Sequence, residues 1–197
     1  FEDCLQSCRN ATANKSFVVA HSFKRKTLSM LVSEGYKIIF ILRDPRDQLV
    51  STADWIKEGQ WPWLPVSQID DDEALITELI TGNTYNWRCY EKSIGSRLDL
   101  VRLFPSSRVY ITRFEDLVGP EGGGDGIVQR REILDIASFL NVELLPEKIE
   151  SVSKEAFGGT WTFRRGQIGV WKERFTPEQK VLYKSIYAAT LIELGYE

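Results

Sequence analysis

Three short, mostly apolar runs occur along the chain, and each leads into a cluster of polar residues. They are SFVVAHSF, YKIIFIL and VYIT, at residues 16–23, 36–42 and 109–112. Continuous runs rich in valine, isoleucine and aromatic residues are typical of strands that other elements cover on both faces. We therefore expect three strands, of which residues 36–42 give the clearest pattern.

Apolar residues elsewhere recur at helical spacing. The spacing predicts helices over residues 26–35, 46–59, 73–104 (broken near Gly82 and Gly95), 128–142, 145–157 and 176–197. Asp44 can cap the second helix and Pro45 can open it, and Thr176 and Pro177 can do the same for the last helix. Loops are expected at residues 60–72, 119–126 (a flexible, glycine-rich loop) and 160–175.

Strands that alternate with helices favour an α/β fold, in which a parallel sheet carries helices on both faces. The length of 197 residues fits one domain, and neither internal repeats nor a linker-like composition divides the chain. We therefore expect residues 1–197 to form a single domain.

Composition argues against several other classes of protein. The net charge of −3 disfavours a nucleic-acid-binding surface, and no apolar run approaches the ~18 residues of a membrane-spanning helix. Cys4, Cys8 and Cys89 are too few and too scattered for a disulfide framework, so we expect free thiols in a reducing, cytoplasmic compartment. Because His21 is the only histidine, a zinc site of the His/Cys type is poorly supplied, and we expect no metal.

The polar clusters stand where the three strands end. They are AHS at residues 20–22, RDPRD at residues 43–47 and RFED at residues 113–116. The carboxyl ends of parallel strands meet at one edge of the sheet, where open α/β folds bind their ligands. An arginine beside a helix start can hold a phosphate, because the helix offers free N–H groups and the guanidinium a two-point contact. The sequence therefore favours a phosphorylated ligand at this edge.

Each cluster also has a plainer interpretation when it is taken alone. RDPRD can be a capped helix start with self-paired charges, and FRRG at residues 163–166 can be a solvated loop. His21 can be a structural histidine, and the aromatic residues between positions 55 and 90 can belong to the core and a lid. Only a pattern common to these motifs decides between the interpretations.

The combination resembles the cytosolic-type sulfotransferases that use 3′-phosphoadenosine 5′-phosphosulfate (PAPS). The family's strand that ends in a histidine is matched by VVAHSF, and its Arg-(Asn/Asp)-Pro-(Lys/Arg)-Asp peptide by RDPRD with Ser51 behind it. Its Tyr-Glu-Asp-Leu peptide is matched by FEDL, and its Phe-Arg-Lys-Gly and Trp-Lys peptides by FRRGQIGVWK. Four motifs in the right order make the signal specific. The resemblance implies the P-loop nucleotide-kinase-like fold of that family.

The resemblance also implies an activity and a set of site residues. The activity is transfer of a sulfuryl group from PAPS to a hydroxyl or amine acceptor, with adenosine 3′,5′-bisphosphate (PAP) as product and no metal. His21 corresponds to the general base. The nucleotide-binding candidates, with Arg43 and Ser51 at the 3′-phosphate and Phe114 at the adenine, are Arg43, Ser51, Phe114, Arg164, Arg165 and Gly166. The candidates for contact with a small, aromatic or phenolic acceptor are Trp61, Trp63 and Trp87.

Some features depart from the family pattern. Val19 stands where the family has a lysine two residues before its histidine, and Phe114 lacks the hydroxyl of the family's tyrosine. No glycine precedes Gly35, so the family's phosphosulfate-binding loop is not in this sequence, and we expect that the chain lacks an N-terminal strand and loop. The peptide that forms a dimer contact in some relatives is only partly matched, which leaves the oligomeric state open.

Two other functions stay open from the sequence. Val19 and the missing loop favour a non-catalytic module that binds PAP or a protein partner. A kinase related to P-loop enzymes has less support, because neither a Walker lysine nor a magnesium-binding pair is evident.

Overall fold

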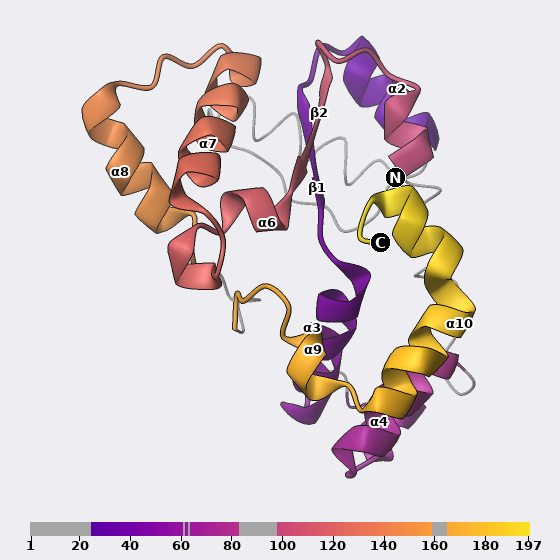
Figure 1. Cartoon of the computed structure of the whole chain (residues 1–197). Helices are drawn as coiled ribbons and strands as arrows, with labels where there is room; N and C mark the ends of the chain where they lie inside the picture. Colours follow the sequence, from indigo (N-terminus) through magenta and orange to yellow (C-terminus); the bar gives the residue numbers. More distant parts are fainter. Residues whose placement is uncertain (1–24, 61, 63, 83–97, 159–164) are drawn as a thin grey trace.

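The computed structural model describes residues 25–60, 62, 64–82, 98–158 and 165–197 (Figure 1). The strand expected at residues 16–23 therefore lies outside the described residues. The elements are α2 (Arg25–Ser33), β1 (Ile38–Leu42), α3 (Pro45–Lys57), η1 (Pro65–Gln68), α4 (Asp72–Thr81), β2 (Val109–Arg113), α6 (Phe114–Leu117), η2 (Pro120–Gly122), α7 (Gly126–Leu140), α8 (Pro146–Glu155), α9 (Trp171–Arg174) and α10 (Pro177–Leu194).

The sheet of the described residues consists of β1 and β2, which pair in parallel from Ile38 opposite Val109 to Leu42 opposite Arg113. The expectation of parallel strands is thereby confirmed for these two elements. Because both strands end at the same edge, Arg43 and Phe114, the next residues along each chain segment, emerge side by side. The parallel pairing therefore brings two of the predicted site residues, Arg43 and Phe114, close together.

Helices cover both faces of this sheet, as the α/β pattern predicts. One face packs into an apolar cluster with α2, the helical residues 98–102 and the end of α10; its buried members are Leu28, Leu42, Leu98, Val101, Val109 and Leu194. On the other face, the ring of Tyr110 lies 5.4 Å from that of Phe139 in α7. In Figure 1, α7 and α8 accordingly lie on one side of the strands, and α2 and α10 on the other.

A second apolar cluster fixes α3, the helix that leaves β1 at the candidate edge. The apolar residues of α3 recur at helical spacing and pack against α4, α10, Leu64, Val66 and Phe175; those from α3 are Leu49, Val50, Ala53 and Ile56. Each fully buried side chain of this size stabilises the fold by about 1.5–3 kcal/mol. Packing against α4 and α10 therefore fixes the position of α3.

The predicted capping residues are confirmed at the two helices nearest the candidate site. The Asp44 side chain accepts a hydrogen bond from the Arg46 N–H, and Pro45 is the first residue of α3. Thr176 forms a capping box with Gln179 at the start of α10. These caps satisfy backbone N–H groups that the helix itself leaves unpaired.

Two expected loops have more structure than the sequence indicated. Residues 160–175 include the short helix α9, and the glycine-rich residues 119–126 form η2 and tight turns instead of an open, flexible loop. Gly122 packs so closely that an added Cβ would lie 2.5 Å from the carbonyl oxygen of Gly166. Glycine is needed here because two backbone segments approach closely. Composition alone does not show whether a glycine serves close approach or flexibility.

Candidate functional site

Arg43 stands at the centre of the candidate site. Its guanidinium lies over the ring of Phe114, 4.3 Å from the ring centre, and its Nη2 donates to the carbonyl oxygen of Gln167 at 3.2 Å. Its Nε is buried and has no hydrogen-bond partner among the described residues. Burial lowers the pKa of Arg43, although nearby carboxylates including Asp47 and Glu115 oppose this shift. A cation that is only partly paired by the protein is suited to receive an anion.

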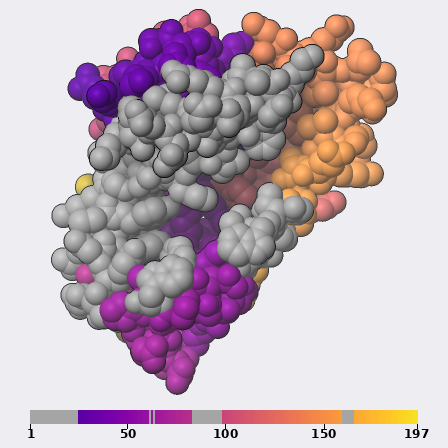
Figure 2. Space-filling model, turned by 180° about the vertical axis from the view of Figure 1, so that it is seen from behind, coloured from indigo at the N-terminus to yellow at the C-terminus, as the bar shows by residue number. Residues whose placement is uncertain are grey.

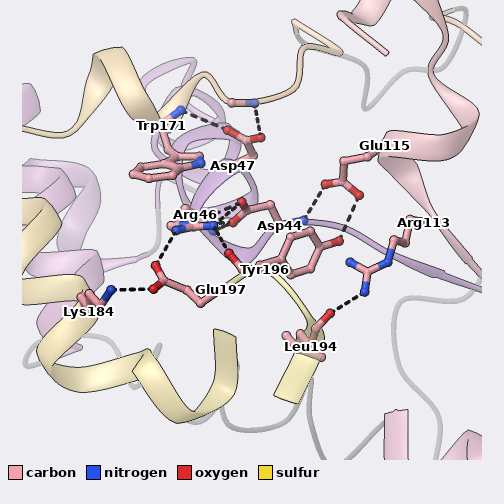
Figure 3. A network of polar contacts seen from close by, with 11 residues as sticks. Asp44, Arg46, Asp47, Arg113, Glu115, Trp171, Lys184, Leu194, Tyr196 and Glu197 are labelled. Carbon is pink, nitrogen blue, oxygen red and sulfur yellow. Dashed lines mark hydrogen bonds and ion pairs between the residues drawn. The ribbon is translucent and has the colours of Figure 1, made fainter. Parts of the chain in front are cut away.

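Asp47 holds the loop that approaches Arg43. Its carboxylate accepts hydrogen bonds from the N–H groups of Gly169, at 2.7 Å, and Trp171, at 3.0 Å (Figure 3). Burial raises the pKa of Asp47, and these two backbone donors partly offset the shift. Asp47 therefore has a structural role, in which its hydrogen-bond donors are backbone N–H groups.

Gly166 lies in the same loop and is buried with a φ of +60°. A side chain would be strained at this φ. The neighbouring Ile168 N–H donates to the Gly122 carbonyl oxygen at 2.9 Å. The loop is therefore fixed from two sides, by α3 through Asp47 and by the glycine turn.

Ser51 lies on α3, and Arg165, in the 165–170 loop, pairs with a residue of the same helix. Asp54, one turn after Ser51, pairs with Arg165 (Nε to Oδ2, 3.3 Å) and with Arg174 (Nη2 to Oδ1, 3.1 Å). The side chain of Arg165 is 55% exposed, so this ion pair is weak and can be exchanged for another anion. The structure thus brings β1, α3 and the 165–170 loop together around Arg43.

Phe114 has a described contact that the sequence did not predict. Its ring is the surface on which the Arg43 guanidinium lies, and contact with an adenine ring stays a prediction. An arginine over an aromatic face gains about 0.5–2 kcal/mol and loses orientational freedom. Phe114 therefore restricts the orientation of Arg43.

Five predicted residues lie outside the described residues: His21, Arg164, Trp61, Trp63 and Trp87. Their roles as base, phosphate contact and acceptor wall stay predictions. Figure 2 shows the opposite face of the molecule, on which violet atoms in the colour range of the β1–α3 region are visible.

Arg46 is buried, which the sequence did not indicate. The guanidinium binds Asp44 at 2.8 Å and Glu197 at 3.3 Å and lies 4.0 Å from the Trp171 ring centre. Burial alone would lower its pKa, but the hydrogen-bonded Asp44 raises the pKa of Arg46 overall. Figure 3 shows that this group joins the start of α3 to the end of the chain.

Glu115 and Tyr196 are site neighbours that sequence reasoning missed. Glu115 accepts from the Asp44 N–H at 2.8 Å and from the Tyr196 hydroxyl at 3.0 Å (Figure 3). Glu115 falls inside the FEDL motif and could have been singled out there. No sequence signal points to Tyr196, because 81 positions separate it from its partner.

The described residues contain no cluster of three or more His, Cys, Asp or Glu side chains arranged to hold a metal ion. The expectation that the reaction needs no metal therefore stays a prediction. In the same part of the chain, no helix combines the length and apolar character needed to cross a membrane.

Comparison with known proteins agrees with the motif pattern. The family model described as the sulfotransferase domain matches residues 6–195. Sulfotransferase 6B1 of Danio rerio is 25% identical over 171 residues, which make up 79% of this chain and 52% of that protein. This chain therefore spans about half the length of the curated relative that it matches.

A solved structure is similar in fold. The crystal structure of mouse sulfotransferase SULT7A1 complexed with PAP aligns with a TM-score of 0.59 at 16% identity, and the match covers 83% of this chain and 60% of that chain. The likeness confirms the α/β fold with its parallel sheet and helices.

Proposed function

Because this chain belongs to the sulfotransferase family, we propose that it binds PAPS at the edge where β1 and β2 end. We propose further that it transfers the sulfuryl group to a hydroxyl or amine of a small acceptor. The observation that carries the proposal is Arg43 beside the start of α3. Its guanidinium is partly buried, and its Nε has no hydrogen-bond partner within the part of the chain that the structure describes.

The 3′-phosphate is the group that Arg43 would recognise. A phosphate oxygen can take a charge-assisted hydrogen bond from Nε, while the Phe114 ring keeps the guanidinium plane in one orientation. Ser51 would add a hydroxyl from α3, and Arg165 and the Gly166 backbone would close the site from the loop. Arg164 would contribute a further cation from the same loop.

The reaction resembles phosphoryl transfer, with in-line attack and a loose transition state. The acceptor oxygen forms a bond to sulfur while the bond between sulfur and the 5′-phosphate oxygen breaks. His21 would take the proton of the acceptor, because a neutral imidazole is a competent base near pH 7. The residues that hold the nucleotide would fix the sulfur in attack geometry, which is the larger part of catalysis in such reactions.

The acceptor is the least defined component of the proposal. Trp61, Trp63 and Trp87 would form an aromatic wall that favours an aromatic or phenolic small molecule over a charged polymer. A cytoplasmic location, a single domain over residues 1–197 and the absence of a metal requirement belong to the same proposal.

A non-catalytic PAP-binding module is the second candidate, and Val19 favours it. A lysine at this position in the family would place a cation near the reacting groups, whereas valine supplies none. Both candidates require the same Arg43-centred phosphate site, so nucleotide binding does not separate them. Only turnover does.

The test is sulfuryl transfer by the full-length protein from labelled PAPS to a panel of phenols, alcohols and amines. We expect turnover that survives a chelator, and we expect His21→Ala to lower it by about 10²–10⁴-fold while PAP affinity is retained. Turnover of the variant near the wild-type rate would remove His21 as the base. PAP binding by the wild-type protein with no turnover on any acceptor would establish the non-catalytic candidate.

A further inference from the structure

The segment of residues 194–197 lies against the carboxyl ends of both strands (Figure 3). Arg113, the last residue of β2, donates from Nη2 to the Leu194 carbonyl oxygen at 2.6 Å. Its guanidinium also lies 4.6 Å from the centre of the Tyr196 ring. Arg46 donates from Nη2 to the Tyr196 carbonyl oxygen at 3.1 Å. Two arginines at the sheet edge therefore fix the position of Tyr196.

The hydroxyl of Tyr196 reaches the start of α3 through one carboxylate. It donates to Oε2 of Glu115 at 3.0 Å, and Oε1 of Glu115 accepts from the Asp44 N–H at 2.8 Å. Burial, with the charge of Glu115 as the next cause, raises the pKa of Tyr196. The hydroxyl therefore stays protonated and remains a donor to Glu115 throughout the physiological pH range.

The Asp44 N–H belongs to the peptide group that joins Arg43 to Asp44. Holding that N–H restricts the backbone orientation of Arg43, and Glu115 is the group that holds it. Glu115 also follows Phe114, whose ring lies against the Arg43 guanidinium. The first turn of α6 therefore restrains Arg43 twice, once through its backbone and once through its side chain.

We propose that Tyr196 is a positioning residue for the 3′-phosphate contact. It orients Glu115, and Glu115 sets the Arg43–Asp44 peptide and the Phe114 platform on which Arg43 depends. The proposal rests on the proposed function, because it assumes that Arg43 binds the 3′-phosphate. It concerns discrimination between nucleotides with and without this group, in addition to the stability of the fold.

The experiment compares the affinities of PAP and 5′-AMP, which differ only in the 3′-phosphate, by titration calorimetry on the wild-type protein and on Tyr196→Phe. Phenylalanine keeps the ring beside Arg113 and removes only the hydroxyl. We expect the Kd for PAP to rise roughly fivefold, the effect of losing about one net hydrogen bond, and the Kd for 5′-AMP to stay the same. A residue that only stabilised the fold would leave the ratio of the two constants unchanged.

Lys184→Ala is the matched control. Lys184 binds Glu197 in the same segment at 2.6 Å, but its side chain is exposed and makes no described contact with Glu115. We expect this variant to keep the wild-type ratio. An unchanged ratio in Tyr196→Phe, or an equal change in Lys184→Ala, overturns the positioning role. Failure of the wild-type protein to prefer PAP overturns the proposed function itself.

A double-mutant cycle tests the route through Glu115. Glu115→Gln leaves one carbonyl oxygen to serve two donors, so the link between Tyr196 and Asp44 is already weakened. In the Glu115→Gln background we expect Tyr196→Phe to change the ratio of the Kd for PAP to the Kd for 5′-AMP by less than about twofold. The reason is that the effects of substitutions at coupled residues are not additive. If the fold-change of the double variant equals the product of the two single fold-changes, Tyr196 does not act through Glu115.

Discussion

The proposed binding role of Arg43 follows from the incomplete pairing of its guanidinium among the described residues. One nitrogen donates to the Gln167 carbonyl oxygen and the guanidinium face rests on Phe114, while the buried Nε has no partner among the described residues. Burying a charged donor without an acceptor is costly, and a phosphate oxygen would remove that cost. Binding of an anion at this nitrogen would therefore be favourable.

Arg43→Ala should weaken PAP binding by about 10- to 100-fold, the range for loss of a hydrogen bond between charged groups. Titration calorimetry measures the change. Arg130→Ala is the control, because Arg130 lies on α7 in an exposed ion pair with Glu150 and should leave the affinity unaltered. If PAP binds Arg43→Ala as tightly as the wild-type protein, Arg43 does not contact the nucleotide.

Neighbouring residues of the RDPRD peptide have different structural roles, and the sequence could predict only some of them. Asp44 caps its own helix, so its role follows from the next two residues. Asp47 and Arg46 depend on partners more than 120 positions away, in the 169–171 backbone and at Glu197. The sequence was therefore sufficient to predict the local helix cap, but it was not sufficient to predict the hydrogen bonds to distant residues.

At the scale of elements, predictability follows the length and the capping of each segment. The strand at residues 36–42 and the helices α3 and α10 carry long patterns and clear caps, and the structure contains them. The helix α9 has only four residues, too few for a periodic signal, so the sequence pattern predicts a loop there. It forms because Asp47 and Arg174 hold its ends, and both act through distant partners.

Arg174 attaches α9 to two other helices. It binds Asp72 at the start of α4 through two hydrogen bonds, at 2.6 and 2.8 Å, and Asp54 of α3 at 3.1 Å. The Arg174 hydrogen bonds hold the pKa of Asp72 below its ordinary value of 3.8. This cluster keeps the loop of Arg165 and Gly166 close to α3.

The lowered pKa of Asp72 predicts a pH effect on stability. A carboxyl whose pKa is depressed by folding stabilises the protein above its unfolded pKa, and this contribution is lost as pH falls through the folded pKa. Asp72→Asn should therefore be less stable than the wild-type protein at pH 7 by about 0.5 kcal/mol, a value reduced for the exposure of the pair. The difference should shrink below about pH 4.

Urea unfolding between pH 2 and pH 7 measures this difference. Asp99→Asn serves as the control, since Asp99 is 67% exposed and its 3.6 Å pair with Arg102 is weak. A stability difference between Asp72→Asn and the wild-type protein that stays constant over the whole range would show that the Asp72 charge does not stabilise the fold.

At the scale of the whole molecule, the site is a product of topology. Parallel strands end at one edge, so polar clusters 70 residues apart in sequence become neighbours, and the sequence pattern was sufficient to predict this for β1 and β2. The attachment of residues 194–197 to that edge was not predictable, because the end of α10 carries no sequence motif that indicates which residues it contacts. The family resemblance identified candidate ligand-contacting residues, but it did not identify Glu115 and Tyr196, which lie beside them.

The measurement that tests the central claim most directly is the unfolding temperature of the protein with PAP and with 5′-AMP at equal concentration. A ligand that binds only the folded state adds about 2.7 kcal/mol when its concentration is 100 times its Kd. We predict a clear rise in Tm with PAP and a much smaller one with 5′-AMP, because only PAP carries the phosphate that we propose Arg43 binds. Equal shifts with the two nucleotides would contradict the account.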